Sequence, residues 1–268
     1  MHCTAVPQSI FREKVTDTSD CFLVWMGKTP YPQALDLQMR ICKLKKLGFD
    51  RDVLLLLEHP PTITMGRSGN PDHLLAKEAD LKSGGIGFWN VDRGGDITFH
   101  GPGQLVGYPI LLLKGHERDV RNYMRRLEES LMRLLAHYQI EAMRVTQFTG
   151  VWTSKGKIAA MGVHISRWIT RHGFALNVNT DLSFYDLIVP CGIADRGVTS
   201  IQNHISSKVD LREVADQYIL EFGRVFKRNM IPIEREDLSG RLNQYEEELT
   251  TMKVRARSDK ASVSQSFS

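Results

Sequence analysis

The stretch FWNVDRGGDITFHGPGQLVGYPILLL, residues 88–113, decides the class of fold. Short apolar pieces of strand length alternate in it with glycines and polar residues, which predicts several strands joined by tight turns. Helical patterns lie on either side, at about 32–47 and about 119–139. Because strands and helices are mixed without strict βαβ alternation, we expect an α/β or α+β fold with a mixed β-sheet flanked by helices.

Further elements follow from apolar periodicity. The predicted strands include 22–26, 53–60 and the start of 62–70, and a predicted meander covers 149–180 with turns at TSKGK (153–157) and ITRHG (169–173). The first helix is expected to bury a stripe of Leu35, Met39 and Cys42. The second is expected to bury Val120, Met124, Leu127, Leu131, Leu134 and Tyr138. An acidic N-cap at Asp210 opens another helix.

Composition limits the classes of function. The net charge of +4 favours acidic partners without indicating nucleic-acid binding, and the arginines of helix 119–139 are interpreted as a solvated face or, less favoured, a docking patch. The four cysteines lie far apart with no CxxC, which argues against structural zinc and disulfides. No apolar run approaches the ~18–20 residues of a membrane span. The N-terminal residues carry no apolar signal core, so a cytoplasmic location is expected.

One catalytic domain is expected over 21–233. Residues 1–20 form a polar lead-in. Residues 234–268 form a polar tail, with a short helix at 239–252 and a disordered last dozen residues.

Two segments hold candidate binding residues. DRGGDITFHGPGQ (92–104) has neither the Gly-Lys-Ser/Thr ending of a phosphate-binding loop nor GxGxxG. Its glycines alone favour a turn-rich hairpin, whereas its Arg, His and Gln residues favour a substrate-binding loop. In KGKIAAMGVHI (155–165), Lys157 is interpreted as an exposed turn lysine or as a lysine beside a ligand, with room left by Ala159, Ala160 and Gly162.

Cys191, in LIVPCGIADRG (187–197), is either a nucleophile or an inert buried thiol. A free thiol has a pKa of ~8.5, so a nucleophilic cysteine needs a neighbouring cation or base. The candidate partners are His100, His164, His172 and Lys157. Sequence spacing does not choose among them, because such partners meet only in the folded chain.

Three motifs together resemble the lipoyl/octanoyl transferases over about residues 22–230. They are RGGDITFHGPGQ (93–104), GVW…KIAAMGVH (150–164) and HGFALNVNTDL…VPCGI (172–193). The resemblance implies a fold shared with the catalytic domains of lipoate- and biotin-protein ligases. It implies an acyltransferase that moves an octanoyl group from octanoyl-acyl carrier protein to a lysine of lipoyl domains, as the first step of protein lipoylation. The implied acceptors are 2-oxoacid dehydrogenase E2 subunits and the glycine cleavage H protein.

The resemblance also assigns roles to residues of this chain. Cys191 matches the nucleophile that carries the acyl group as a thioester, and Lys157 matches the lysine that lowers the thiol pKa and acts as general acid and base. The implied acyl pocket consists of Arg93, Gly94, Gly95, Asp96, Ile97, Thr98, Phe99, His100, Ala160, Met161, Gly162, Gly173, Phe174 and Ala175. No metal, ATP, nucleic acid or membrane is implied, and the location becomes the mitochondrial matrix if the source is eukaryotic.

Arg93 is expected to orient its loop or to meet the phosphate of the carrier arm, because a guanidinium suits an apolar acyl tail poorly. Three alternative functions are weighed. An ATP-dependent lipoate or octanoate ligase of the same fold would not need Cys191. A Cys-dependent thioesterase would release free octanoate. A non-catalytic binder of acyl carrier or lipoyl domains would need only the basic helix face.

Overall fold

The computed structural model describes residues 18–190 and 197–265. Its main feature is an eight-stranded mixed sheet with the strand order β11-β1-β2-β6-β10-β9-β8-β7, and a separate three-stranded sheet has the order β4-β3-β5. The strands are β1 (Ser19–Lys28), β2 (Asp52–Glu58), β3 (Thr62–Met65), β4 (Gly87–Asn90), β5 (Ile97–His100), β6 (Gln104–Ile110), β7 (Met143–Val145), β8 (Phe148–Thr153), β9 (Gly156–Ser166), β10 (Ile169–Asn177) and β11 (Arg228–Pro232). The expected mixed sheet is confirmed.

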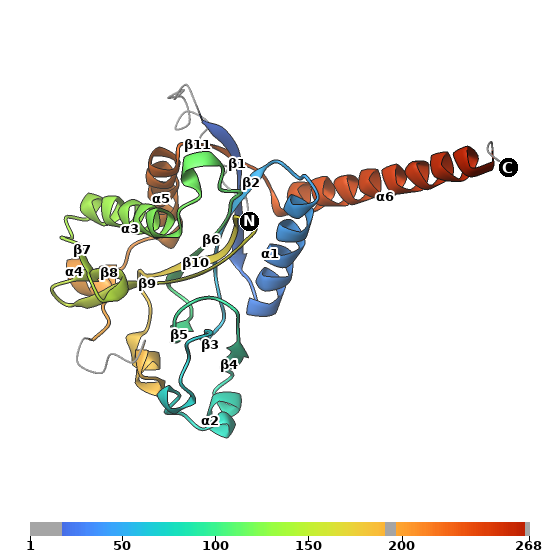
Figure 1. The fold of residues 1–268 in the computed structure, drawn as a ribbon. Coiled ribbons are helices and arrows are strands. Elements are labelled where there is room, and N and C mark those ends of the chain that lie inside the picture. Colours follow the sequence, from blue (N-terminus) through green and yellow to red (C-terminus); the bar gives the residue numbers. More distant parts are fainter. Residues whose placement is uncertain (1–17, 191–196, 266–268) are drawn as a thin grey trace.

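Helices cover both faces of the large sheet (Figure 1). They are α1 (Tyr31–Lys46), α3 (Val120–His137), α4 (Ile201–Ile205), α5 (Leu211–Phe226) and α6 (Arg235–Gln265), whereas α2 (Glu78–Ser83) lies beside β4 of the small sheet. One apolar core lies between the sheet and α3 with α5, a second between the sheet and α1 with α6, and a third beneath the small sheet. Strand β2 is apolar almost throughout because both of its faces are covered.

Helix α1 buries Cys42 as expected, but the rest of its buried stripe differs from the prediction. Met39 is 48% exposed and Leu35 is only partly buried, whereas Ala34, Gln38, Ile41 and Lys45 are covered. The polar members have partners outside the helix: Gln38 Oε1 accepts from the backbone N–H of His172 at 2.8 Å, and Lys45 pairs with Asp52 at 2.9 Å. Polar residues of a helix can be buried when other parts of the fold supply hydrogen-bond partners, and the pattern of apolar residues within the helix does not show this.

Helix α3 follows its prediction more closely. Leu127, Leu131 and Leu134 are fully buried, although Val120 at the helix start is 48% exposed. Its arginines are largely engaged by carboxylates; Arg133, for example, bonds Glu129 at 3.0 Å. This agrees with the solvated-face interpretation.

The turn expected at ITRHG (169–173) is wrong, because these residues lie within β10. The chain reverses at Arg167 and Trp168, which have φ of 52° and 63°. Two consecutive residues of positive φ form the hairpin turn whose twist matches the flanking strands. The usual Asn-Gly signal for such a turn is missing here, so the sequence pattern placed it too late.

The C-terminal segment also differs from its prediction. Instead of a short helix at 239–252 followed by disorder, α6 runs to Gln265, in keeping with a segment free of proline and rich in helix-forming residues. Leu238 and Leu242 are fully buried against the α1 side of the sheet. The start of the expected tail thus packs on the folded chain, and the extent of the catalytic domain stays a prediction. Of the expected lead-in, residues 1–17 lie outside the described residues.

Candidate active site

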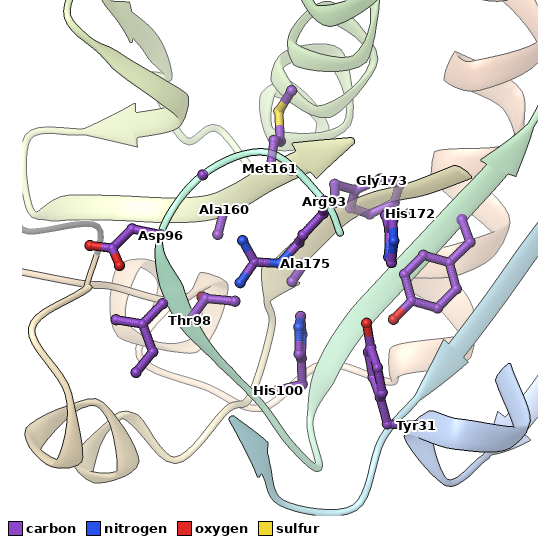
Figure 2. A pocket seen from close by; sticks show the side chains of 15 residues that line it. Tyr31, Arg93, Asp96, Thr98, His100, Ala160, Met161, His172, Gly173 and Ala175 are labelled. Carbon is purple, nitrogen blue, oxygen red and sulfur yellow. The ribbon is translucent and has the colours of Figure 1, made fainter. Parts of the chain in front are cut away.

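A cavity of about 450 Å³, including its open mouth, lies between the large sheet and the small sheet (Figure 2). Strands β9 and β10 form its floor, β5 and the Gly-rich loop before it form one wall, and α1 and β6 contribute the far end. The lining residues are Tyr31, Arg93, Gly95, Asp96, Ile97, Thr98, His100, Tyr108, Ala160, Met161, Gly162, His172, Gly173, Phe174 and Ala175.

The cavity unites all but two of the residues in the implied acyl pocket. The exceptions are Gly94 and Phe99. Phe99 is buried in the third core, where its ring stacks on Phe184 with centroids 4.7 Å apart. Gly94 donates its N–H to the carbonyl of Val163 at 2.9 Å, which docks the Gly-rich loop on β9. Whether the lining residues bind an acyl group stays a prediction.

Small residues let the loop approach the floor. Ala160 pairs with Ala175 and Gly162 with Gly173 across β9 and β10. A Cβ atom on Gly162 would lie 2.6 Å from the carbonyl oxygen of Gly94, so no larger residue fits while the loop keeps its position. The glycine is therefore required by close backbone approach.

Arg93 makes hydrogen bonds that hold the Gly-rich loop in place. This agrees with one of the two roles expected for it. Its Nη2 donates to the carbonyl of Thr64 at 2.7 Å and to Thr64 Oγ1 at 2.9 Å, and its Nη1 donates to the carbonyl of Gly94 at 3.1 Å. Arg93 is 8% exposed, and its guanidinium joins the Gly-rich loop to Thr64 on β3. The alternative role, contact with a phosphate, is untested.

A directed chain of hydrogen bonds runs from this wall to β9. Thr64 lies 3.3 Å from His100 Nε2, and His100 Nδ1 donates to Gln104 Oε1 at 3.0 Å. Gln104 then donates to Asn177, and Asn177 donates to the carbonyl of Thr199, each at 3.0 Å. The N–H of Thr199 finally donates to the carbonyl of Lys157 at 2.9 Å. The chain fixes one neutral tautomer of His100.

Two lining residues were missed in the sequence, Tyr31 and Tyr108, whereas His172 was expected as a candidate partner of Cys191 and not as part of the pocket. These three residues come from α1, β6 and β10, and only folding brings them together. The Tyr108 hydroxyl donates to His59 Nε2 at 2.7 Å, while His59 Nδ1 donates to the carbonyl of Thr29 at 2.7 Å. Tyr31 stacks on His100 with ring centroids 6.2 Å apart.

Burial keeps the histidines around the cavity uncharged. It lowers the pKa of His59 to about 4 and, with the cations Arg171 and Arg93 nearby, lowers that of His172 to about 3. The pKa of His100 lies well below its usual range for the same reason, and that of His164 is also lowered by burial. Three candidate partners for Cys191 are therefore neutral near pH 7.

A β-bulge determines the face of β9 on which the Lys157 side chain lies. Val151 pairs with Ala159 but Trp152 pairs with Lys157, which leaves one extra residue on β9. Ile158 and Ala159 both pack in the α3–α5 core instead of on opposite faces, so Lys157 lies on the face that also carries Ala160. The Lys157 ammonium lies 4.8 Å from the ring centroid of Trp152. Lys157 is 6% exposed, which excludes the exposed-turn interpretation.

Cys191 lies outside the described residues, so its role stays a prediction. The described chain stops at Pro190 and resumes at Gly197, whose carbonyl accepts the N–H of Lys157 at 2.9 Å. On the Pro190 side, the N–H of Val189 donates to the carbonyl of His73 at 2.8 Å, and the His73 imidazole contacts the Asp96 carboxylate. Both flanks of the segment are thus tied to the site.

Two searches concern other classes of site. Among the described residues, no group of three or more His, Cys, Asp or Glu side chains is placed to hold a metal ion. Within the same residues, no helix has the length and apolar character needed to cross a bilayer.

The sequence and the fold were compared with known proteins. The family model for the lipoyl protein ligase A/B catalytic domain matches residues 30–223. An octanoyltransferase from Solibacter usitatus is 48% identical over 213 residues, covering 80% of this chain and 96% of that protein. An octanoyltransferase from Desulforamulus reducens is 44% identical over 206 residues, covering 76% of this chain and 90% of that protein.

Solved structures share the fold at low identity. Lipoate-protein ligase A bound with ATP has a TM-score of 0.67 at 17% identity, covering 85% of this chain and 93% of that chain. A bipartite lipoate protein ligase from Thermoplasma acidophilum has a TM-score of 0.68 at 16% identity, covering 85% and 91% respectively. These likenesses bear on the fold alone.

Proposed function

The chain belongs to the family of lipoyl protein ligase A/B catalytic domains and is a transferase of the lipoyl(octanoyl) type, and from that premise we propose its substrates and mechanism. The donor is octanoyl-acyl carrier protein. The acceptor is a lysine of a lipoyl domain, in 2-oxoacid dehydrogenase E2 subunits or the glycine cleavage H protein. Transfer passes through a thioester on Cys191, without ATP or metal, and is expected in the cytoplasm.

The observation that carries the proposal is the state of the polar groups around the cavity. His100, Tyr108 and Arg93 direct their hydrogen bonds at other protein groups. The cavity therefore meets a ligand with ring faces, methylenes and small residues such as Ala160 and Gly162. A lining in which Arg93 is held by Thr64 and Gly94 and Asp96 by His73 suits an alkyl chain, because these charged groups keep their protein partners when the chain displaces water.

In the first half-reaction, the Cys191 thiolate attacks the thioester carbonyl of the donor. A new bond forms between the acyl carbon and Cys191 Sγ, and the bond to the pantetheine sulfur breaks. Lys157 donates a proton to the departing sulfur, which leaves as a thiol. Exchange of one thioester for another is nearly isoenergetic, so the step needs no external energy source.

In the second half-reaction, the neutral amine of the acceptor lysine attacks the Cys191 thioester. An amide bond forms, the bond to Sγ breaks, and the proton lost by the amine passes to Lys157, which regains the state it had at the start. Conversion of a thioester into an amide is downhill and drives the transfer. The burial of Lys157 beside Trp152 supports this role, since a dry site strengthens the pull of the ammonium on a thiolate.

Intact mass spectrometry tests the proposal. After mixing with octanoyl-acyl carrier protein, we expect one octanoyl adduct on the wild type and on Cys42→Ala, and none on Cys191→Ala. Cys42 is a fair control because it is buried beside the carbonyl of Thr170, away from the cavity lining. Absence of an adduct on the wild type would refute the covalent mechanism.

Two further arms separate the alternatives. Octanoate and ATP without acyl carrier protein should give no modified lipoyl domain, whereas a ligase would modify it. Octanoyl-acyl carrier protein without a lipoyl domain should give the adduct with little free octanoate, whereas a thioesterase would release it continuously.

The role of Lys157 is tested by the pH profile of adduct formation. Lys157→Ala should move the profile to higher pH and slow transfer at pH 7 by ~10²–10⁴-fold, the range of general acid–base catalysis. Lys155→Ala provides a matched control, since its side chain bonds the carbonyl of Asn203 instead. An unchanged profile in Lys157→Ala would remove Lys157 from the mechanism.

A further inference from the structure

The cavity has two chemically different ends, which gives the site a direction. Along β9, Ala160 lies beyond the bulge from Lys157, and Gly162 lies two residues further on, at about 3.3 Å per residue. Tyr108 follows Gly107, which pairs with Phe174 on β10, so it lies beyond the same floor. Figure 2 shows Tyr31 and His172 on the opposite side of the cavity from Asp96 and Thr98. The aromatic end is therefore remote from Lys157.

The aromatic end is a firm wall. Tyr31, Tyr108 and His172 are 3%, 3% and 2% exposed. Tyr108 is anchored to His59 by its hydroxyl, and His172 Nε2 donates to Asp92 Oδ1 at 2.9 Å. Tyr31 is held by packing against two histidines. Its ring centroid lies 5.2 Å from that of His59 and 6.2 Å from that of His100. Side chains fixed in this way yield little to an entering group.

We propose that Tyr31 is the end stop of the acyl slot and sets the upper limit of acyl-chain length. This inference rests on the proposed function: with the thioester carbon held at the Lys157 end, the alkyl chain extends along Ala160 and Gly162 and its terminal methyl meets the Tyr31 ring. A longer chain finds the ring in its path. A shorter chain leaves the wall uncontacted and forgoes the apolar burial there.

Tyr31 is the member of the wall that a variant can alter cleanly. Its hydroxyl makes no hydrogen bond to another residue of the described chain, whereas truncating Tyr108 would orphan the buried His59 nitrogen. Tyr31 is the first residue of α1, and its backbone conformation does not require an aromatic side chain. Loss of the ring thus opens space at one end and leaves the rest of the lining bonded.

The test is a competition between two donors. Octanoyl- and decanoyl-acyl carrier protein at equal concentration are offered with a lipoyl domain, and mass spectrometry gives the ratio of decanoylated to octanoylated product. In Tyr31→Ala we expect this ratio to rise about fifteenfold over wild type, because each methylene that gains a buried position changes an equilibrium about fourfold. Tyr31→Leu should give a smaller rise, and Tyr31→Phe, which keeps the ring, none.

Tyr245→Ala serves as a control for a general loss of packing, since Tyr245 lies on α6 and packs on Phe49, away from the cavity. Its product ratio should equal that of wild type. An unchanged ratio in both Tyr31→Ala and Tyr31→Leu would overturn the end stop, as would loss of both products from these variants while they stay folded. If the proposed function itself is wrong, the wild type produces no octanoylated domain at all, which distinguishes the two failures.

Discussion

Replacement of Gly162 by alanine tests the docking of the Gly-rich loop on β9. The added Cβ would lie 2.6 Å from the carbonyl oxygen of Gly94 and 3.0 Å from Arg93 Cδ. Neither neighbour yields easily, since Arg93 is tied to Thr64 and the Gly94 N–H is bonded to Val163. The loop must move away by about 0.8 Å to reach ordinary contact, which costs about 1–3 kcal/mol in overpacking. A weakened backbone hydrogen bond adds about 1 kcal/mol.

The free energy of unfolding, measured by urea denaturation, should fall by about 2–4 kcal/mol in Gly162→Ala. Octanoyl transfer per folded molecule should fall as well, because the cavity wall shifts relative to its floor. Gly94→Ala is the matched control for stability: its Cβ would meet only the carbonyl of Val163, at 3.5 Å, and its unfolding free energy should stay within about 1 kcal/mol of wild type. Equal stability of the two variants would refute the close-approach argument.

The remaining predictions concern pH and the C-terminal helix. Because the folded pKa of His59 is about 4, only the unfolded chain binds this proton between about pH 6.5 and 4, so His59 contributes a loss of about 2 kcal/mol of stability between pH 7.5 and 5. His59→Asn should show a correspondingly shallower pH dependence in urea unfolding, and identical slopes would contradict the assignment. Leu242→Ala should lower the unfolding free energy by about 2–5 kcal/mol, since Leu242 is fully buried. Met252→Ala, at 64% exposed, should change it by less than about 0.5 kcal/mol, and equal losses would show that α6 does not pack as described.

Elements with a strong local signal could be predicted from the sequence. Strand β2 is apolar along its length and α3 repeats leucines at helical spacing, so their patterns survive folding unchanged. The stripe of α1 could not be predicted, because Gln38 and Lys45 are buried only through partners more distant in the chain. The β9–β10 hairpin was misplaced because Arg167 and Trp168 adopt positive φ without the glycine that normally signals it.

Some residues of the candidate site could likewise be predicted from the sequence, and others could not. Its Gly-rich loop and small-residue floor form continuous motifs, and these motifs marked most of the cavity lining. Tyr31 and Tyr108 stand alone in unremarkable segments, and nothing local distinguishes them from core tyrosines. The burial of Lys157 depends on a bulge whose only sign is the register between β8 and β9, a property of two strands together. Pairwise features of this kind require the folded chain.

The bulge on β9 has a consequence for how the strand tolerates change in length. Side chains of a strand alternate between the two faces of the sheet, and the extra residue Ile158 shifts this alternation by one position. Deletion of Ile158 would restore a single alternation and keep the pairings of Lys157 with Trp152 and of Ala159 with Val151, so Lys157 would stay on the face of Ala160. The extra residue therefore lets Lys157 and Ala160, three positions apart, share one face, and the direction of Lys157 is fixed by its pairing with Trp152, not by the residues of the floor.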